Sequence, residues 1–363
     1  MTWGAGSQVR LTADLTAGRL LEQPAQTVDR YITHTQLATT LTVTSPPDQT
    51  AATNPIHVAG TAVPGATIDV ADIGTGTTTH ASGTAAADGS FSFDIAPLIG
   101  NNVLVVTSTA PNGGTAQAVR TVVNDVVQGT LLFDATDPAG DDNGPGNYAY
   151  PTSPDFHAGA FDLTDFQVYD TGTTVTFRVQ TRDLTPTFGS PLGAQLVDVY
   201  VHQPGASPTS TAASFPQRNY AIAPGSAWSR LLEVQGFGQR FVDSTNTNTV
   251  GTITISANQI SRYITFSVDK AALGGTPASG WIFTVVLTGQ DGFSSDQARG
   301  FQPTPQPFQF GVCATASSDP HCTVNPATVP KAVDVLTPSS VTQSDELDYT
   351  KHQPVVISGV AIP

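Results

Sequence analysis

The chain has 363 residues, too many for one ordinary β-sandwich, so two or three domains are expected. Its formal net charge of −15 would repel phosphate backbones and anionic membranes, which makes nucleic acid a poor partner. No apolar run reaches the roughly 18 residues of a membrane-spanning helix, and only 12% of the residues are charged. The abundant Thr, Ala, Gly and Ser favour short strands joined by turns.

Residues 1–35 differ in pattern from everything that follows them. The stretch "MTWGAGSQVRLTADLTAGRL" predicts a helix that ends at Gly18, with Pro24 shortly beyond it. Its apolar residues fall on two faces, and such a helix is normally buried between helical neighbours. The rest of the chain offers no such neighbours, so we interpret this segment as the last piece of another domain.

Residues 40–127 change to a period of two. The stretches "PIHVAGTAVPGATIDV", "DGSFSFDI" and "NNVLVVTSTA" alternate apolar and polar residues between Gly, Pro and Asn turns. Phe91, Phe93 and Ile95 should face one core, as should Ile68 and Val70. Several short strands at this spacing predict an immunoglobulin-like β-sandwich, without the Cys–Trp–Cys pattern of antibody domains.

Residues 128–363 predict a second, larger β-sandwich. Strands are expected at "TVTFRVQ", "QLVDVYVH", "GTITIS", "RYITFSV" and "WIFTVVLTG", separated by long polar stretches. The stretch "VPKAVDVL" predicts a short helix or an irregular segment. Long loops on a rigid sandwich are where binding sites usually lie.

The loop "DPAGDDNGPGNYAYP", residues 137–151, concentrates oxygen ligands directly after a strand-like run. Calcium takes about six to eight oxygens from carboxylates, amides and carbonyls, and glycines let the backbone fold around the ion. The register is not that of an EF-hand, because Pro145 and Thr152 stand where ligands would be needed. The alternative is an Asx-rich turn without metal. The expected ligands for one calcium ion are Asp134, Asp137, Asp141, Asp142, Asn143 and Asp162, with Asp165 nearby.

Sugar binding is the other chemistry that the loops favour. Pyranose rings stack on flat aromatic side chains while neighbouring polar groups bind the hydroxyls. Trp281 alternates with apolar residues and is expected in the core rather than in a site. The candidate carbohydrate-binding residues come from "FPQRNYAIAPGSAWSR" and "LTGQDGFSSDQARGF": Arg218, Asn219, Tyr220, Trp228, Gln290, Asp291 and Arg299.

Cys313 and Cys322 bracket a short polar loop. This spacing predicts a local disulfide and therefore an oxidising compartment, which favours a secreted protein. The alternatives are a pair of reduced thiols or a zinc site that uses His321, although structural zinc takes four ligands.

Enzyme signatures are sparse. The sequence has no G-x-S-x-G, H-E-x-x-H, P-loop or Rossmann glycine motif. Glycosidases generally need two carboxylates that flank the scissile bond, and the three glutamates, Glu22, Glu233 and Glu346, lie in separate segments. A complete active site within these residues is not expected.

Several of these stretches together resemble a known family. Residues 1–31 are similar to the closing helix and exit strand of the (α/α)6-barrel catalytic domain of glycoside hydrolase family 15, the glucoamylase and glucodextranase family. The immunoglobulin-like stretch resembles the domain that follows this barrel in glucodextranases. The remainder resembles the glucodextranase-type C-terminal module through "DPAGDDNGPGNYAYPT", "FDLTDFQV", "FGSPLGAQLVDVYVHQPG", "FPQRNYAIAPGSAWSRLLEVQGFG", "VVLTGQDGFSSDQARGF" and "QSDELDY". The fold of that module is shared by family 9 carbohydrate-binding modules and DOMON domains.

The resemblance implies an accessory region of a secreted, exo-acting hydrolase of dextran-like or starch-like α-glucans. The catalytic glutamates of the barrel match nothing in this chain, so this region alone is not expected to hydrolyse glucans. Its partner would be the α-glucan or its own catalytic barrel. The alternatives are attachment to the cell envelope in the manner of surface-layer modules, with calcium bridging to the wall, and a purely structural role in buttressing the barrel. A haem site of the DOMON kind is not expected, because Met1 is the only methionine.

Overall fold

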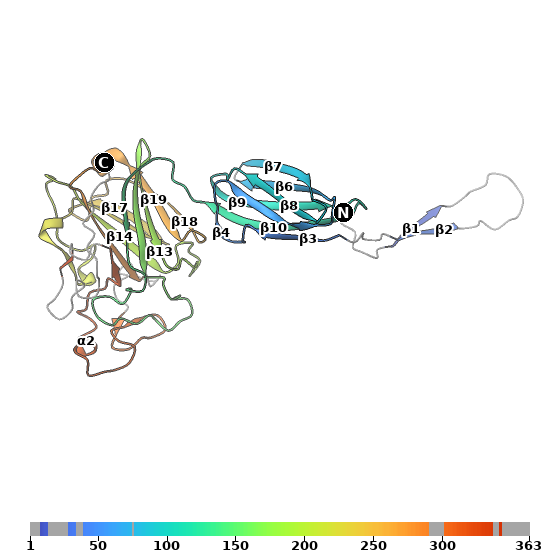
Figure 1. Cartoon of the computed structure of the whole chain (residues 1–363). Coiled ribbons are helices and arrows are strands. Elements are labelled where there is room, and N and C mark those ends of the chain that lie inside the picture. Colours follow the sequence, from blue (N-terminus) through green and yellow to red (C-terminus); the bar gives the residue numbers. More distant parts are fainter. Residues whose placement is uncertain are drawn as a thin grey trace, which may run out of the picture. The chain divides into compact units, whose positions relative to one another are not determined.

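The computed structural model describes residues 39–74, 76–289 and 301–336, together with the backbone of strands at residues 8–13, 28–33 and 341–342. The chain divides into two compact units, Met1–Val126 and Val127–Pro363, whose strands are labelled in Figure 1. Both units are built from mainly antiparallel sheets, with parallel pairing at β4–β10 and β21–β22, and the predicted all-β fold class is confirmed. None of the helices in the described ranges is long and apolar enough to cross a bilayer.

The predicted N-terminal helix is wrong where the structure describes this segment. Strand β1 (Gln8–Ala13) pairs antiparallel with β2 (Val28–Thr33), and Val9 lies opposite Ile32. The sequence "QVRLTA" alternates polar and apolar residues, and "VDRYIT" is rich in β-branched side chains, which favours strands. For so short a run, the period of two predicts the secondary structure better than the helical pattern does.

The rest of the first unit is a sandwich of a three-stranded and a five-stranded sheet, in the orders β3-β5-β8 and β4-β10-β9-β6-β7. Its core contains Ile68 and Val70 from one sheet and Phe91 and Ile95 from the other, with Phe93 packed at its margin. The strands are β3 (Leu41–Ser45), β4 (Thr50–Ala51), β5 (Ile56–Ala62), β6 (Thr67–Gly74), β7 (Thr77–Thr84), β8 (Ser90–Ile95), β9 (Gly100–Thr109) and β10 (Thr115–Asn124).

The second unit packs two five-stranded sheets face to face. The first sheet has the order β11-β12-β13-β19-β18 and the second the order β17-β16-β14-β20-β23. Their strands are β11 (Thr130–Thr136), β12 (Leu163–Asp170), β13 (Thr174–Thr181), β14 (Gln195–His202), β16 (Arg230–Gln235), β17 (Gly238–Asp243), β18 (Ile253–Asn258), β19 (Tyr263–Asp269), β20 (Ile282–Gly289) and β23 (Asp334–Val335). The segment "VPKAVDVL" therefore supplies an edge strand, β23, rather than a helix.

Short elements fill the connections of this unit. The α-helices in the described residues are the single-turn α1 and α2. The short elements are η1 (Pro216–Arg218), β15 (Ala221–Ile222), η2 (Pro224–Ser226), α1 (Lys270–Leu273), β21 (Phe301–Gln302), β22 (Phe310–Gly311), α2 (Pro320–Thr323) and β24 (Val341–Thr342).

Aromatic rings dominate the space between the two sheets. Phe177 stacks on Phe266 with ring centroids 5.5 Å apart, and Phe283 from the opposite sheet packs edge-on against Phe177 at 6.0 Å. Trp281 is partly buried and packs against the same core. This agrees with the prediction from its alternation with apolar residues in the sequence.

The second sheet is covered on its outer face as well. Strand β14 is buried on both faces: Val197, Val199 and Val201 face the core between the sheets, while Tyr200 lies in a separate apolar cluster. That cluster includes Trp228 and Ile222 from the long connection between β14 and β16, as well as Val335 from β23. The connection is therefore a third layer over the sheet. Several predicted site residues are buried in this layer.

Candidate functional site

A cluster of carboxylates lies where the first sheet of the second unit meets the loop after β11. Asp137 directly follows β11 and Asp162 directly precedes β12, and these antiparallel strands bring their ends together. The amide of Asp137 donates to the carbonyl oxygen of Thr164 at 3.0 Å, which fixes the entry to the loop. The strand pairing thus gathers side chains that are about 25 residues apart in sequence.

Asp334 joins this cluster from the other sheet. It begins β23, and its Oδ2 accepts a hydrogen bond from the amide of Leu163 at 2.8 Å. Oxygen atoms of Asp137, Asp141 and Asp334 all lie within 4.8 Å of one another. Asp334 was not among the predicted ligands, although a lone aspartate inside the apolar stretch "VPKAVDVL" is a signal for a buried site, because carboxylates are rarely buried without a partner.

Several oxygens in the cluster are buried and have no hydrogen-bond partner within the described part of the chain. They are Asp137 Oδ2, both carboxylate oxygens of Asp141, Asn143 Oδ1 and Asp162 Oδ1. The Asp162 side chain is fully buried, and that of Asp137 is 9% exposed. Buried polar atoms are normally hydrogen-bonded, so converging oxygens without donors fit a cation better than they fit a folded turn.

Burial and mutual repulsion raise the pKa values of these carboxyl groups. Burial, followed by repulsion from Asp141 and Asp162, raises the pKa of Asp137 to about 8. The pKa of Asp162 is raised to about 6, by burial first and by Asp142 second, while the Gly140 amide and Arg182 oppose the shift. The pKa of Asp334 is raised well above its ordinary value for the same reasons. A divalent cation would remove this repulsion.

Asp142 lies beside the cluster with polar partners of its own. It accepts a hydrogen bond from the Tyr150 hydroxyl, and its Oδ1 lies 3.7 Å from Arg182 Nη2. Arg182 Nε also lies 2.5 Å from Asp162 Oδ2. The oxygens of Asp142 are thus occupied by Tyr150 and Arg182. Asp142 helps to position the cluster and does not add an unpaired oxygen to it.

Asp134 does not belong to the cluster, and its prediction as a ligand is wrong. Side chains alternate along β11, so exposed Asp134 points to the opposite face from buried Phe133, Ala135 and Asp137. Asp165 lies on the face of Asp134, where it accepts a hydrogen bond from the Tyr263 hydroxyl at 2.6 Å. Burial raises the pKa of Asp165 to about 6.

Trp228 is fully buried, so the prediction that it stacks on a sugar is wrong. Its ring packs 5.7 Å from that of Tyr200, and its Nε1 donates to the carbonyl oxygen of Ala212 at 2.8 Å. Tyr220 is buried beside it, with its hydroxyl 3.0 Å from that of Tyr200. Neither ring presents a face to a ligand.

Arg218 is also fully buried, which contradicts its assignment to sugar hydroxyls. Its Nη1 donates to Thr288 Oγ1 at 2.9 Å, and its Nη2 lies 3.8 Å from Glu233 Oε2, while Nε lies 4.0 Å from Asp198 Oδ2. Burial and the neighbouring Asp198 raise the pKa of Glu233 to about 7, against the effects of Arg218 and Arg240. This buried ionic network holds the third layer to the sheet.

Asn219 remains partly exposed and lines a pocket of about 540 Å³. Its amide nitrogen donates to the carbonyl oxygens of Ala327 and Val329. Gln217, Gln302 and Asn325 add amide groups to this wall, and buried Lys331 lies at its base with Nζ 4.8 Å from the centroid of the Phe301 ring. We call this the amide pocket. The other candidate sugar-binding residues, Gln290, Asp291 and Arg299, lie outside the described residues.

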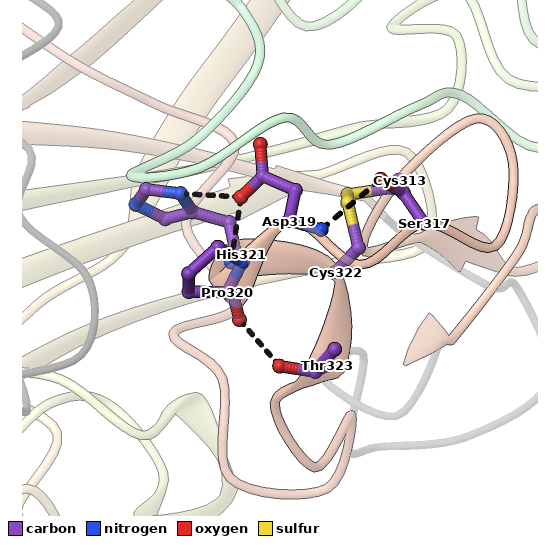
Figure 2. Close-up of a disulfide and its surroundings, with 7 residues drawn as sticks. All are labelled: Cys313, Ser317, Asp319, Pro320, His321, Cys322 and Thr323. Carbon is purple, nitrogen blue, oxygen red and sulfur yellow. Dashed lines mark hydrogen bonds and ion pairs between the residues drawn. A yellow bond between two sulfur atoms is a disulfide. The ribbon is translucent and has the colours of Figure 1, made fainter.

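Cys313 and Cys322 form a disulfide with Cα atoms 5.4 Å apart, so neither thiol is available to zinc (Figure 2). Between them, Asp319 caps helix α2, and its Oδ1 accepts a hydrogen bond from the amide of His321 at 2.9 Å. The same oxygen lies 3.1 Å from His321 Nδ1. Figure 2 shows the histidine ring turned toward this carboxylate.

Residues 132–358, more than half of the chain, match the family model described as the SLH-like C-terminal binding module of glucodextranase. The chain belongs to this family. Both the carboxylate cluster and the amide pocket fall within the matched residues of the glucodextranase-type module. Among curated proteins, none matches the chain.

Solved structures show only distant similarity to the chain. A tetra-tandem repeat from the extending region of a large adhesion protein is 16% identical with a TM-score of 0.24, covering 78% of this chain and 52% of that one. The chain thus spans about half the length of that repeat structure. A carbohydrate-binding module of the β-sandwich superfamily is 10% identical with a TM-score of 0.18, covering 69% and 96%. A Ca²⁺-stabilized, ice-binding adhesin of an Antarctic bacterium is 17% identical with a TM-score of 0.17, covering 78% and 77%.

Proposed function

We propose that this chain is the carbohydrate-binding accessory region of a secreted, exo-acting α-glucan hydrolase of the glucodextranase type. The observation that carries the proposal is the match of residues 132–358 to a binding module of that enzyme. The disulfide between Cys313 and Cys322 supports an extracellular location. In this proposal the catalytic barrel belongs to the parent enzyme, and the module holds the polysaccharide near it.

Glu233 illustrates why the described residues suit binding rather than hydrolysis. Its carboxylate is 3% exposed and lies between Arg218 and Arg240, at 3.8 and 3.4 Å. A glycosidase acid must reach the glycosidic oxygen, and a glutamate enclosed in an ionic network cannot do so. Its role is to hold the third layer in place.

The carboxylate cluster would hold one calcium ion as a structural cofactor. Asp137, Asp141, Asp162 and Asp334 would supply carboxylate oxygens and Asn143 an amide oxygen, which is the ligand chemistry that calcium prefers. The ion would neutralise the buried charge and fasten the loop to both sheets. Calorimetry with and without EDTA tests this role, and an unchanged melting temperature would remove it.

Affinity electrophoresis of the full chain through gels that contain dextran or soluble starch tests carbohydrate binding. Retardation by either polysaccharide, relative to a gel without it, is the expected result. An unretarded chain in both gels would contradict the proposal.

Attachment to the cell envelope is the second candidate function, and the SLH-like character of the family model favours it. A chain that sediments with purified cell walls in calcium, and is released by EDTA, would support attachment. Retardation by α-glucans without wall binding would support the first proposal instead.

A further inference from the structure

Neither the amide pocket nor the groove between β17 and β18 is lined by an exposed aromatic ring. In the amide pocket, Phe301 is 6% exposed, and in the groove of about 640 Å³ between β17 and β18, Phe241 is 1% exposed. A pyranose that is bound by stacking needs a flat apolar face open to solvent. The aromatic contact that Trp228 was expected to provide must therefore lie elsewhere if the module binds sugars.

Three tight turns in the second unit each place a phenylalanine at a central position. The turns are Thr187–Ser190, Gln235–Gly238 and Gln306–Gln309, and each is closed by an antiparallel residue pair. Their central phenylalanines are Phe188, Phe237 and Phe308. Within the described part of this unit, Phe237 and Phe308 are the exposed large hydrophobic residues, at 53% and 50%.

Turn chemistry does not account for Phe188. The central positions of two-residue turns favour Gly, Asn, Asp and Pro, because the backbone must turn sharply. Phe188 has a φ of 54°, and Gly189 follows with 77°, so a bulky residue occupies the left-handed region that glycine or asparagine fills at lower cost. Backbone strain of this kind is concentrated at functional sites.

The three turns lie together. The rings of Phe188 and Phe308 are 6.3 Å apart, and both pack against Phe156, at 5.8 and 6.3 Å. The third turn joins them because Gly236 packs so closely on Ser190 that a Cβ there would collide with the serine hydroxyl. We call Phe188, Phe237 and Phe308 the phenylalanine surface.

The surroundings of these rings favour an uncharged, hydroxyl-rich partner. The net charge of −15 disfavours nucleic acids and other polyanions, for which aromatic platforms also serve. Glutamines flank two of the rings, with Gln306 and Gln309 around Phe308 and Gln235 near Phe237. A surface that binds another protein would instead be expected to present a continuous apolar centre, which is buried when the complex forms. Separate rings between amide side chains suit the alternation of apolar ring faces and hydroxyl groups along a polysaccharide.

We propose that the phenylalanine surface stacks against successive pyranose rings of a neutral polysaccharide. The inference rests on the proposed carbohydrate-binding function and names the residues that make the contact. The planes of Phe188 and Phe308 are inclined at 48°, so the pair forms a shallow V rather than a flat strip. Such a shape fits a curved α-glucan chain better than the flat face of crystalline cellulose.

Affinity electrophoresis of the full chain in soluble starch and in dextran, with a pull-down on microcrystalline cellulose, tests the proposal. Phe308→Ala and Phe237→Ala are each expected to weaken α-glucan binding roughly three- to tenfold, the contribution of one aromatic contact. Phe308→Tyr keeps a flat ring and should bind like the parent chain. Ile99→Ala is the matched control, because Ile99 is 59% exposed but lies in the first unit. Melting temperatures show that each variant is folded.

The outcomes separate this inference from the proposed function. If the parent chain is retarded by an α-glucan and both alanine variants are retarded equally, the phenylalanine surface is not the contact, while carbohydrate binding stands. If the parent chain is not retarded at all, both fail. Equal or stronger binding of the parent to cellulose would overturn the preference for curved chains. A parent chain that self-associates, with Phe308→Ala restoring monomers and leaving sugar retention unchanged, would assign the surface to contacts between copies.

Discussion

Replacement of Asp137 by asparagine should distinguish a cation site from a cluster of protonated acids. Without a metal, the folded chain holds the Asp137 proton up to a pKa of about 8, against 3.8 as the ordinary value. The folded state therefore binds more protons than the unfolded state between these values, and stability falls as the pH rises from about 4 to about 8. At about 1.4 kcal/mol for each pH unit, the loss has an upper limit of roughly 6 kcal/mol.

Calcium should oppose this loss. An ion at 100 times its dissociation constant adds about 2.7 kcal/mol to the stability of the folded state. For a unit the size of Val127–Pro363, this corresponds to a rise in melting temperature of roughly 5–11 °C. The rise should be larger at pH 8 than at pH 5, because protons compete with the ion at the lower pH.

Differential scanning calorimetry in EDTA and in calcium, at both pH values, makes the comparison. At pH 8, Asp137→Asn should melt above the parent chain in EDTA, because it removes a buried charge, and it should gain less than half of the parent's response to calcium. Asp134→Asn is the matched control, since Asp134 lies on β11, three residues before Asp137, but is exposed and outside the cluster. A parent chain that ignores calcium at pH 8, or an Asp137→Asn variant that responds like the parent, would refute the cation site.

Two further predictions concern the third layer. Trp228→Ala should lower the free energy of unfolding, measured in urea, by about 3–5 kcal/mol, because it leaves a cavity at a fully buried site. Reduced sugar binding at unchanged stability would contradict the assignment of Trp228 to the core. Arg218→Ala should cost about 3–5 kcal/mol at pH 8, because Asp198 and Glu233 lose their buried partner. The loss of stability in Arg218→Ala should be smaller at pH 5, because Glu233, with a pKa of about 7, is protonated there. An equal loss at both pH values in guanidinium titrations would contradict the electrostatic explanation.

Periodicity predicted part of the strands in each sandwich, because a buried face leaves a regular pattern in the sequence, but it did not predict others such as β16 and β17. The runs predicted at "TVTFRVQ" and "QLVDVYVH" correspond to β13 and β14. The oxygen-rich loop at residues 137–151 also stands out in the sequence, since its carboxylate and amide side chains are concentrated in one stretch. Asp334 was harder to find because it reaches the cluster through strand pairing across the sandwich, and its bond to Leu163 spans 171 residues.

The wrong predictions at Trp228, Tyr220 and Arg218 have a common cause in the third layer. Trp228 and Arg218 stand in a polar, loop-like stretch, which normally indicates exposure. The useful signal was in β14 instead, where Leu196 and Tyr200 are apolar positions on the face that a two-layer sandwich would leave in water. A strand that is apolar on both faces requires a cover, and the nearest long connection provides it.

The phenylalanine surface was hidden for the opposite reason. The motifs "TFGS", "QGFG" and "QPFQ" read as ordinary turns because of their glycines and proline. Only the structure shows that the three turns lie together, that Phe237 and Phe308 are exposed and that Phe188 is half-buried. An aromatic residue at the centre of a tight turn is the sequence signal that indicates such a surface.

The loop of residues 137–151 and the phenylalanine surface are connected through backbone hydrogen bonds. Immediately after the loop, the amides of Thr152 and Ser153 donate to the carbonyl oxygens of Gln306 and Pro307, at 2.9 and 3.0 Å, in the turn that carries Phe308. Tyr150, whose hydroxyl donates to Asp142, packs its ring 5.8 Å from Phe310 at the other end of the same turn. An ion that orders the loop should therefore also order the turn.

Calcium is accordingly expected to strengthen polysaccharide binding, by roughly fivefold if the coupling is at the weak end of the usual range. Retention in starch gels should fall in EDTA for the parent chain, while Asp137→Asn should show the same weak retention with and without calcium. Coupling free energy is reciprocal, so saturating α-glucan must tighten calcium binding by the same factor, which isothermal titration can measure. If the parent chain responds thermally to calcium but its retention does not change, the ion stabilises the loop without positioning Phe308, and the two sites act independently.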